Sequence, residues 1–466
     1  SLTAIQQAAR KLQENIAPIQ SRWAAFQPSN EVLELLGQGD VGVTEQQVRE
    51  NLDKQASIVF DYINRSNFGT QFYEAALDLL IGTATLRIDE TDDEQNPIVF
   101  HCIPQKGIAF EEGPFGNVET HWRRFNVKAR LLERMWRGVE VSPAIRSQIE
   151  NSPDADLKVS EGVVFVPNAT GYFGCLWVNE EDRFSWIEDF GEPSPLVSGR
   201  YTKVAGEVRG RGPAMQCLPD VRSLNKAKEF VLQKAAIDLA GMYTATDDGV
   251  TNPYNLTIAP GVVIPVGSNN TSNPSIMRLD TGTNLGLAQF EITELQNSIK
   301  LALFNDLRDP TGPVRTATEI AIENRELAKR IGSAFGRLQT EVLIPVLKRV
   351  VAILTRRGLI MPIELDGKDV EVKFTSPLAR AQDGEDLLSL QQAVQFVAAN
   401  AGPDFLSMSF KLEDFGDYVA KKTGMASELV RSETEKQQAL QAGAQLVQEQ
   451  QQGQMSQEQP SLQAVE

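Results

Sequence analysis

The residue types that carry most enzyme chemistry are sparse or badly spaced in this sequence. His101 and His121 are the two histidines, and neither belongs to an HExxH zinc motif or stands near a GxSxG serine. A GxxxxGK(S/T) phosphate-binding loop is absent from the sequence. We therefore predict no histidine-based hydrolase and no ATPase, and we assign no catalytic, cofactor-binding or metal-binding residue.

Two short segments match binding motifs only in part. Gly37, Gly39 and Gly42 have the GxGxxG spacing of a dinucleotide site, but the preceding EVLELL does not belong to a βαβ unit. The acidic run at residues 89–94 lacks the glycine and the terminal glutamate of an EF-hand loop. We interpret the first segment as a turn between helices and the second as a solvated loop.

The cysteines and the hydropathy exclude two further classes. Cys102, Cys175 and Cys217 are widely spaced and form no CxxC pair, so neither a disulfide framework nor a cysteine zinc site is indicated. This pattern is typical of a reducing cytoplasm. No run approaches the roughly 20 apolar residues needed to cross a bilayer, and the sequence therefore predicts no membrane protein.

The charge balance limits how the chain can meet nucleic acid. The 466 residues include 62 acidic and 45 basic side chains, for a formal net charge of -17. A conventional DNA-binding surface holds phosphates with Lys and Arg, so any DNA contact is expected to be local or transient. The same carboxylates leave open an enzyme with a catalytic carboxylate pair, such as a glycoside hydrolase.

Hydrophobic periodicity divides the first half of the chain into helices followed by strands. A capping-box pattern at Thr44 and Gln47 predicts a helix up to about Ile63, and a second helix carries Phe72 to Leu80. Eight short β-rich segments bounded by Gly, Pro and Asn then predict a small antiparallel sheet or barrel. These segments are TATLRI, IVFHCI, GIAFEEG, VETHWRRF, VVFVPN, GYFGCLWVN, RFSWIED and GRYTKVAGEV.

The second half is dominated by long helical patterns. One helix is predicted from Asp220 to Gly241 and another through Phe290 and Leu303, with a Pro- and Asn-rich insert around GVVIPV between them. A long helix follows over residues 316–359, in which Pro345 is expected to produce a kink. A β-like VEVKF, a helical region up to Val430 and a Gln-rich end complete the chain.

Four strings in this order resemble the head-to-tail connectors, or portal proteins, of short-tailed bacteriophages. They are GRGPAMQCLPDVRSLNKAKEFVLQKA at residues 210–235, APGVVIPV at 259–266, RTATEIAIENRE at 315–326 and FTSPLARAQ at 374–382. No single string is as specific as a metal-ligand signature, but together they resemble the family over about residues 48–430. The resemblance implies an α+β fold: an elongated, multi-domain subunit with long helices, a small antiparallel β domain, a small clip and a helical crown.

The resemblance also implies a division of the chain into functional segments. Residues 1–212 would be the N-terminal wing region with its β domain, and residues 213–240 and 288–305 the two stem helices. The remaining segments would be the clip at 241–287, the tunnel loop at 306–315, the long wing helix and a β segment at 316–380, and the crown with the Gln-rich tail at 381–466.

Candidate contact residues follow from this division. Arg308 and Arg315 would lie beside the tunnel loop, and Arg222, Lys226 and Lys234 follow one another on the first stem helix at steps of four and eight, which places them near one face. They are the candidates for touching DNA in an otherwise acidic channel; the alternative is that they are solvated or form ion pairs between subunits. The clip would dock its partners through Asn252, Tyr254, Asn255, Asn269 and Asn270.

The expected partners and location come from the same resemblance. The family forms a ring, usually twelve-fold, through which double-stranded DNA passes without sequence specificity during packaging and ejection. It meets the large subunit of the terminase, a tail adaptor, the major capsid protein and scaffolding protein, and is assembled in the host cytoplasm before it becomes part of the virion. The alternatives are the carboxylate hydrolase and another virion structural protein, such as a tail or scaffold component.

Overall fold

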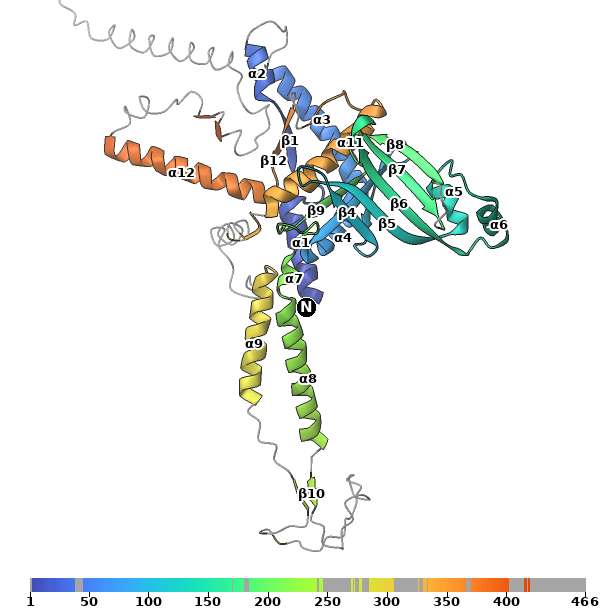
Figure 1. Cartoon of the computed structure of the whole chain (residues 1–466). Coiled ribbons are helices and arrows are strands. Elements are labelled where there is room, and N and C mark those ends of the chain that lie inside the picture. Colours follow the sequence, from blue (N-terminus) through green and yellow to red (C-terminus); the bar gives the residue numbers. More distant parts are fainter. Residues whose placement is uncertain are drawn as a thin grey trace, which may run out of the picture. The chain divides into compact units, whose positions relative to one another are not determined.

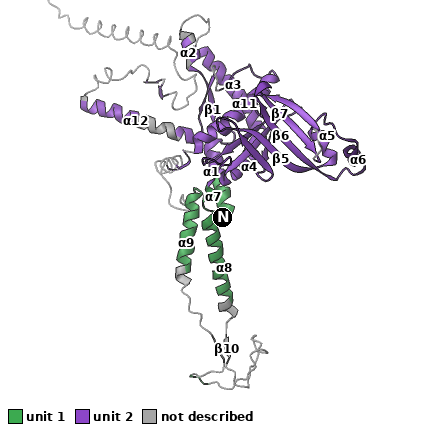
Figure 2. Cartoon of the chain, viewed as in Figure 1, with its two compact units in different colours: residues 1–8, 213–310 green, residues 9–212, 311–466 purple. Residues whose placement is uncertain are grey.

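The computed structural model describes most of the chain and divides it into two compact units. It describes residues 2–37, 45–169, 171–179, 184–240, 243–245, 270, 272, 276–278, 285–305, 326, 330–332, 334–365, 370–401, 415, 416, 418 and 419. Unit 1 contains residues 1–8 and 213–310, and unit 2 contains residues 9–212 and 311–466 (Figure 2). None of the described helices is both long and apolar enough to cross a membrane.

Unit 2 begins with helices and continues into three antiparallel sheets (Figure 1). Its helices before the sheets are α1 (Leu2–Ile16, of which the first turns belong to unit 1), α2 (Asn30–Gly37), α3 (Glu45–Arg65) and α4 (Phe68–Ile81). The strands are β1 (Ala24–Pro28), β2 (Thr83–Glu90), β3 (Ile98–Ile103), β4 (Ile108–Glu112), β5 (Val118–Lys128), β6 (Asp156–Val166), β7 (Gly171–Val178), β8 (Trp186–Gly191), β9 (Leu196–Arg200) and β12 (Val370–Phe374).

The five-stranded sheet is the largest, with the strand order β4-β5-β6-β7-β8. Side chains alternate between its two faces, and Leu157, Val159 and Val163 of β6 lie on the buried face. That face packs against the short helices η1 (Ala129–Leu131), α5 (Leu132–Met135) and α6 (Pro143–Asn151). The predicted antiparallel β region is therefore confirmed as open sheets and not as a barrel, but it is divided in two, because TATLRI and IVFHCI form β2 and β3 of the three-stranded sheet. The predicted strand GRYTKVAGEV is wrong in position, because β9 ends at Arg200.

The three-stranded sheet has the order β3-β2-β9, and α4 packs against β2 and β3. Asn67, next to the first residue of α4, donates from Nδ2 to the Phe100 carbonyl (2.7 Å) and accepts from the Phe100 amide (2.9 Å). The side-chain amide thus occupies the place of a neighbouring strand and satisfies backbone groups that an edge strand would leave unpaired. The predicted helices before this sheet are confirmed as α3 and α4.

The long helix of unit 2 is interrupted by a π-helical turn. Described residues from 334 to 338 are α-helical, η4 (Gln339–Leu343) is a π-helix, and α11 (Ile344–Arg356) continues the chain. Pro345 cannot donate a hydrogen bond to the carbonyl four residues earlier, which belongs to Glu341, and its ring crowds that carbonyl. The disturbance predicted at Pro345 therefore takes the form of a π turn just before it. Residues 316–325 of the predicted helix lie outside the described residues.

Unit 1 contains two long helices. α7 (Pro213–Gln216) leads into α8 (Leu218–Ala240), and α9 (Leu285–Ala302) packs against α8. Pro219 fits the first turn of α8, where its missing amide hydrogen costs nothing. A short antiparallel pair of strands, β10 (Tyr243–Ala245) and β11 (Ile276–Arg278), lies between the helices in the sequence. Both predicted helices are confirmed, whereas most of the Pro- and Asn-rich insert lies outside the described residues.

A pairing of distant segments completes the fold of unit 2. β1 and β12 form an antiparallel sheet in which Ala24 lies opposite Phe374 and Pro28 opposite Val370. α12 (Pro377–Ala401) follows directly. The sequence predicted the strand at VEVKF and the start of a helical region after it, but it did not predict the partner strand β1.

Candidate functional site

The helix α8, which carries three of the predicted contact residues, forms a pair with α9 that is joined at one end. Ser298 of α9 donates from its hydroxyl to the Asp220 carboxylate of α8 at 2.8 Å. Leu224 of α8 and Ile299 of α9 are both buried. Asn305, just after α9, donates from Nδ2 to the Ala4 carbonyl at 2.6 Å and so holds the first turn of α1 to this end of the pair. The pair is therefore fixed where its buried residues lie.

Three of the five predicted DNA-contact residues lie on α8. Arg222 and Lys226 are exposed and stand one turn apart, and Lys234 is half-buried. The Lys226 ammonium pairs with Glu229 (2.9 Å) and lies 4.8 Å from the centre of the Phe230 ring. Arg308 and Arg315 lie outside the described residues, so the structure does not test whether the five gather in one place.

Most of the predicted docking residues also lie outside the described residues. These are Asn252, Tyr254, Asn255 and Asn269. Asn270 is described and exposed, and its Oδ1 accepts a hydrogen bond from the Ser272 amide at 3.3 Å. Its role in docking stays a prediction.

The helix pair exposes large apolar side chains that belong to no site predicted from the sequence. Leu232 of α8 is 70% exposed and Phe290 of α9 is 65% exposed. Phe230 and Leu301 are also exposed. A helix that is apolar on more than its buried face is typical of one that packs against further chains. The signal in the sequence was the apolar run Phe230–Val231–Leu232, because three consecutive apolar residues cannot share one helix face.

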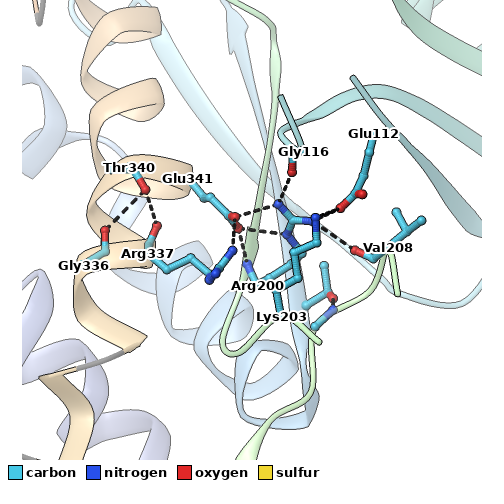
Figure 3. Close-up of polar contacts among 11 residues, drawn as sticks. Glu112, Gly116, Arg200, Lys203, Val208, Gly336, Arg337, Thr340 and Glu341 are labelled. Carbon is cyan, nitrogen blue, oxygen red and sulfur yellow. Dashed lines mark hydrogen bonds and ion pairs between the residues drawn. The ribbon is translucent and has the colours of Figure 1, made fainter. Parts of the chain in front are cut away.

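A buried ion-pair cluster centred on Arg200 joins several elements of unit 2 (Figure 3). The side chain of Arg200 is 1% exposed and lies at the end of β9. Its Nε and Nη2 donate to the two oxygens of Glu341 at 3.1 and 2.7 Å, and Nη2 also donates to the Gly116 carbonyl at 2.8 Å. Its Nη1 donates to the Glu112 carboxylate. Lys203 pairs with the same carboxylate at 2.5 Å.

The Arg200 cluster is built to hold elements together. Burial alone would lower the pKa of Arg200, but the hydrogen bonds and charges of Glu341 and Glu112 outweigh it and raise that pKa above its ordinary value. Arg337 of the long helix donates to the same Glu341 at 3.0 Å. The cluster therefore fixes the π turn of the long helix to β9 and to the β4–β5 hairpin.

A second cluster joins the five-stranded sheet to β2, where Glu161 of β6 accepts from both Arg87 of β2 (2.6 Å) and Arg123 of β5. Burial would raise the pKa of Glu161, but the two guanidinium groups lower it below its ordinary value. Arg87 also pairs with Asp89 at 2.7 Å. The two acids that meet at Arg87 are thus neutralised by it, which is not the arrangement of a glycosidase carboxylate pair.

Neither cluster was predicted, although the sequence contains a signal for each. Glu161 stands just before the predicted strand VVFVPN, at period-two spacing from Val159 and Val163, so a charge lies in register with apolar residues. Arg200 ends a strand segment of which every residue is buried. A charge at a buried position requires a partner. The sequence does not say which residue that partner is.

The solvated loop predicted at residues 89–94 carries ion pairs. Glu90 pairs with Arg357 at 2.8 Å, and Asp92 pairs with Arg137. The run joins β2 to β3 and is anchored to the C-terminal end of α11, where cations also complement the helix dipole. Among the described residues, no group of three or more His, Cys, Asp or Glu side chains could hold a metal ion.

Comparison with known proteins decides the family. A model of the family described as bacteriophage head to tail connecting protein matches residues 1–430. The chain belongs to this family. This confirms the resemblance seen in the four sequence strings, and the α+β fold with its antiparallel sheets agrees with it. The carboxylate hydrolase is not favoured for a head-to-tail connector.

Individual relatives of this connector are distant in sequence. The portal protein of Enterobacteria phage T3 is 22% identical over 410 residues, which cover 84% of this chain and 72% of the relative. The portal protein of Escherichia phage T7 is 23% identical over 448 residues, which cover 93% of this chain and 79% of the relative. A solved neck of an empty gene transfer agent particle matches with a TM-score of 0.33 and 13% identity, over 91% of this chain and 89% of the other. A likeness at that TM-score carries no argument.

Proposed function

We propose that this connector is a portal protein, the subunit of a ring at one capsid vertex through which double-stranded DNA enters during packaging and leaves during ejection. The match of the connector family over residues 1–430 is the observation that carries the proposal. The relatives from phages T3 and T7, both named portal proteins, support it, because this chain covers 72% and 79% of their lengths.

Assembly into a ring would bury the exposed apolar residues of unit 1 between neighbouring subunits. Leu232 and Phe290 stand on the outside of the helix pair formed by α8 and α9. Burying one such side chain between subunits contributes roughly 1.5–3 kcal/mol, and a ring repeats the contact at every interface. We propose twelve copies, the number usual for the family that the sequence resembles.

The segments take the roles that the resemblance implied. We propose that residues 213–240 and 288–305 form the stem around the channel, residues 241–287 the clip, and residues 306–315 the tunnel loop. Residues 1–212 and 316–380 would form the wing, and residues 381–466 the crown. The Arg200 cluster lies within the proposed wing, where it would hold the long helix to the β domain.

The mechanism that we propose is geometric and electrostatic. Each phosphate neutralised by Lys or Arg adds a binding contribution that resists movement of the DNA. A chain with a net charge of -17 supplies few such contacts. Arg222, Lys226 and Lys234, with Arg308 and Arg315, would form sparse basic rings that guide the polyanion without retaining it.

The partners complete the proposal. The clip would dock first the terminase large subunit, which supplies the energy for packaging as a separate motor, and later a tail adaptor. The wing would meet the major capsid and scaffolding proteins. On this proposal the ring assembles in the host cytoplasm, remains in the virion and performs no enzymatic reaction of its own.

Electron microscopy of the purified full chain tests the proposal. Negative-stain images are expected to show closed rings with an axial hole, and native mass spectrometry gives the copy number. Particles that remain monomers or small compact oligomers over the concentration range in which the family assembles would contradict the proposed function.

A further inference from the structure

Phe115 is the most exposed large apolar side chain among the described residues. It lies at the tip of the hairpin that joins β4 to β5, and it is 90% exposed. A single exposed apolar residue is common on protein surfaces and by itself indicates nothing. What distinguishes Phe115 is how firmly the chain around it is held.

Backbone and side-chain hydrogen bonds fix the hairpin tip. The Gly113 amide donates to the Asn117 carbonyl at 2.9 Å, and the Gly116 amide donates to the Gly113 carbonyl at 3.0 Å. Gly116 has a φ of +79°, a conformation that glycine adopts without strain. Below the tip, buried Arg200 donates to the Gly116 carbonyl and to Glu112 (Figure 3). Phe115 therefore projects from an ordered turn, and burying it against a partner would cost little further conformational entropy.

A hollow lies on the same two strands, towards their other end. Its volume is about 560 Å³, within the range of ordinary ligand pockets, and it opens onto the surface. Small residues of β4 and its preceding turn line one side, and aromatic, polar and basic residues of β5, β6 and β7 line the rest. The hollow is lined by residues that include Gly107, Ala109, Trp122, Arg124, Ser160 and Trp177.

The aromatic residues of the hollow are held in place by the sheet. A Cβ atom at Gly162 would lie 2.2 Å from Cζ3 of Trp122, so the indole ring lies directly over the backbone of β6. The centres of the Trp122 and Trp177 rings are 5.4 Å apart with an angle of 35° between their planes. An aromatic side chain entering the hollow would find two fixed rings at the spacing that favours further aromatic contact.

The hollow and the Phe115 tip do not meet within one chain. Ala109 and Phe115 are six residues apart along the hairpin, on the order of 20 Å at about 3.3 Å per residue. The tip carries carboxylates nearby at Glu111 and Glu119, whereas Lys106 and Arg124 stand beside the hollow. The two sites thus stand beside charges of opposite sign, and they occupy different places on the hairpin.

We propose that Phe115 of one copy inserts into the Trp122–Trp177 hollow of the neighbouring copy. The inference rests on the proposed ring. An interface between two different patches of the same chain is heterologous, and repetition of a heterologous contact closes a ring when the rotation allows it. The contact would act as an anchor within a larger interface, because a few buried aromatic residues carry most of the binding energy of such interfaces.

Cysteine cross-linking tests the pairing directly in the full chain. Oxidation of assembled Phe115→Cys/Ser160→Cys protein is expected to give a ladder of linked subunits on a non-reducing gel. An equal mixture of chains carrying Phe115→Cys alone and Ser160→Cys alone is expected to give dimers only, because each chain then has one partner cysteine. Each single variant by itself is the control for the native cysteines, of which Cys175 and Cys217 are buried.

A second measurement does not depend on disulfide geometry. Phe115→Ala, and Ala109→Trp to fill the hollow, are each expected to raise the protein concentration for half-maximal ring formation by about tenfold or more. Combining them is expected to add little, because both remove the same contact. Met361→Ala, at a residue that is 71% exposed, is the matched control and is expected to leave assembly unchanged.

The outcomes separate this inference from the proposed function. The Phe115 contact would be overturned if Phe115→Ala and Ala109→Trp form rings with the wild-type concentration dependence and the cysteine variants form no cross-links. The proposed portal function would then still stand. Rings of the Phe115→Ala variant that form normally but no longer bind capsid or scaffolding protein would also overturn it, since the tip would then dock another partner. A wild-type chain that forms no ring contradicts both.

Discussion

Arg200 and Glu341 are 141 residues apart in sequence and are joined by three hydrogen bonds. The Arg200 backbone amide and Nε donate to Glu341 Oε2 at 3.0 and 3.1 Å, and Nη2 donates to Oε1 at 2.7 Å. Glu341 lies in the π turn of the long helix, whose normal bonding Pro345 interrupts. A side chain therefore secures the backbone at the point where the helix itself is weakest.

Replacing Glu341 with Gln tests this relationship. The variant keeps an acceptor of similar shape but leaves the Arg200 guanidinium with one carboxylate partner in a buried site. Removing one partner of a buried pair costs about 3 kcal/mol or more. We expect a clear fall in the midpoint of thermal unfolding, measured by circular dichroism and calorimetry.

Arg337→Ala is the matched control, because Arg337 also donates to Glu341 but its side chain is 36% exposed. Exposed ion pairs contribute about 0–1 kcal/mol. The control is expected to unfold close to the wild-type temperature. Equal falls in the unfolding temperature of Glu341→Gln and Arg337→Ala would mean that the burial of Arg200 is not the cause of the destabilisation.

Acid should weaken the fold through His121. His121 is buried, its Nε2 lies 2.8 Å from the Ser198 hydroxyl, and burial lowers its pKa from 6.5 to about 4. Because the folded-state pKa is the lower one, the unfolded chain binds more protons between pH 6.5 and 4. Stability from this residue is complete above pH 6.5 and declines as the pH falls, by about 2 kcal/mol at pH 5.

Urea unfolding at pH 7 and pH 5 measures this effect. His121→Asn is expected to unfold more easily at pH 7 but to lose about 2 kcal/mol less than the wild type on acidification. His101→Asn is the control, since His101 is exposed and is the other histidine of the chain. Should the pH dependence survive in His121→Asn, another group must be responsible for it.

Local patterns in the sequence predicted most of the elements, and long-range partners escaped them. The helices α3, α4, α8 and α9 and the strands of the five-stranded sheet follow from periodicity and capping, which depend on neighbouring residues. β1 is five residues long, and its Ala24 pairs with Phe374 of β12, about three quarters of the chain away, so nothing near Ala24 marks it as a strand. The partners of Arg200 and Glu161 were missed for the same reason.

In the candidate site, too, local features were predicted and features that depend on distant residues were missed. The steps of four and eight residues placed Arg222, Lys226 and Lys234 on one helix, and α8 contains all three. The exposure of Leu232 and Phe290 was not predicted: the apolar run around Leu232 signals that one of its residues leaves the buried face, but which one depends on the face of α8 that meets α9. The π turn was predicted only as a disturbance at Pro345, since the sequence does not say how a helix accommodates a proline.

Polar substitution on the outer side of the helix pair should impair assembly without unfolding the subunit. Leu232→Gln and Phe290→Gln each replace a side chain that is already exposed in the single chain. Surface changes of this kind alter stability by about 0.5 kcal/mol or less. If these residues are buried between subunits, losing the contact should raise the concentration for half-maximal ring formation by about tenfold.

Analytical ultracentrifugation across a concentration series measures that shift. Gln233→Ala is the control on α8, because it changes a polar residue that is exposed beside Leu232 and removes only a 3.3 Å hydrogen bond to Glu229. Unchanged assembly of both Gln variants would show that this surface is not an interface between subunits.

Neutralising basic residues on one face of α8 should weaken the hold of the assembled ring on DNA. The affinity for DNA falls as the salt concentration rises. In Arg222→Gln/Lys226→Gln, each phosphate contact that is lost is expected to make the slope of log affinity against log salt concentration less steep by about 0.9. The affinity should fall equally for unrelated DNA sequences, because phosphate contacts carry no sequence information. Lys228→Gln is the control: Lys228 is exposed and lies two positions from Lys226, about 200° around the helix. Fluorescence anisotropy at several salt concentrations measures the slope for each protein. If only the face of Arg222 and Lys226 meets DNA, the slope will change in the double variant and stay at the wild-type value in Lys228→Gln. Equal slopes for the wild type and both variants would place these residues outside the DNA path.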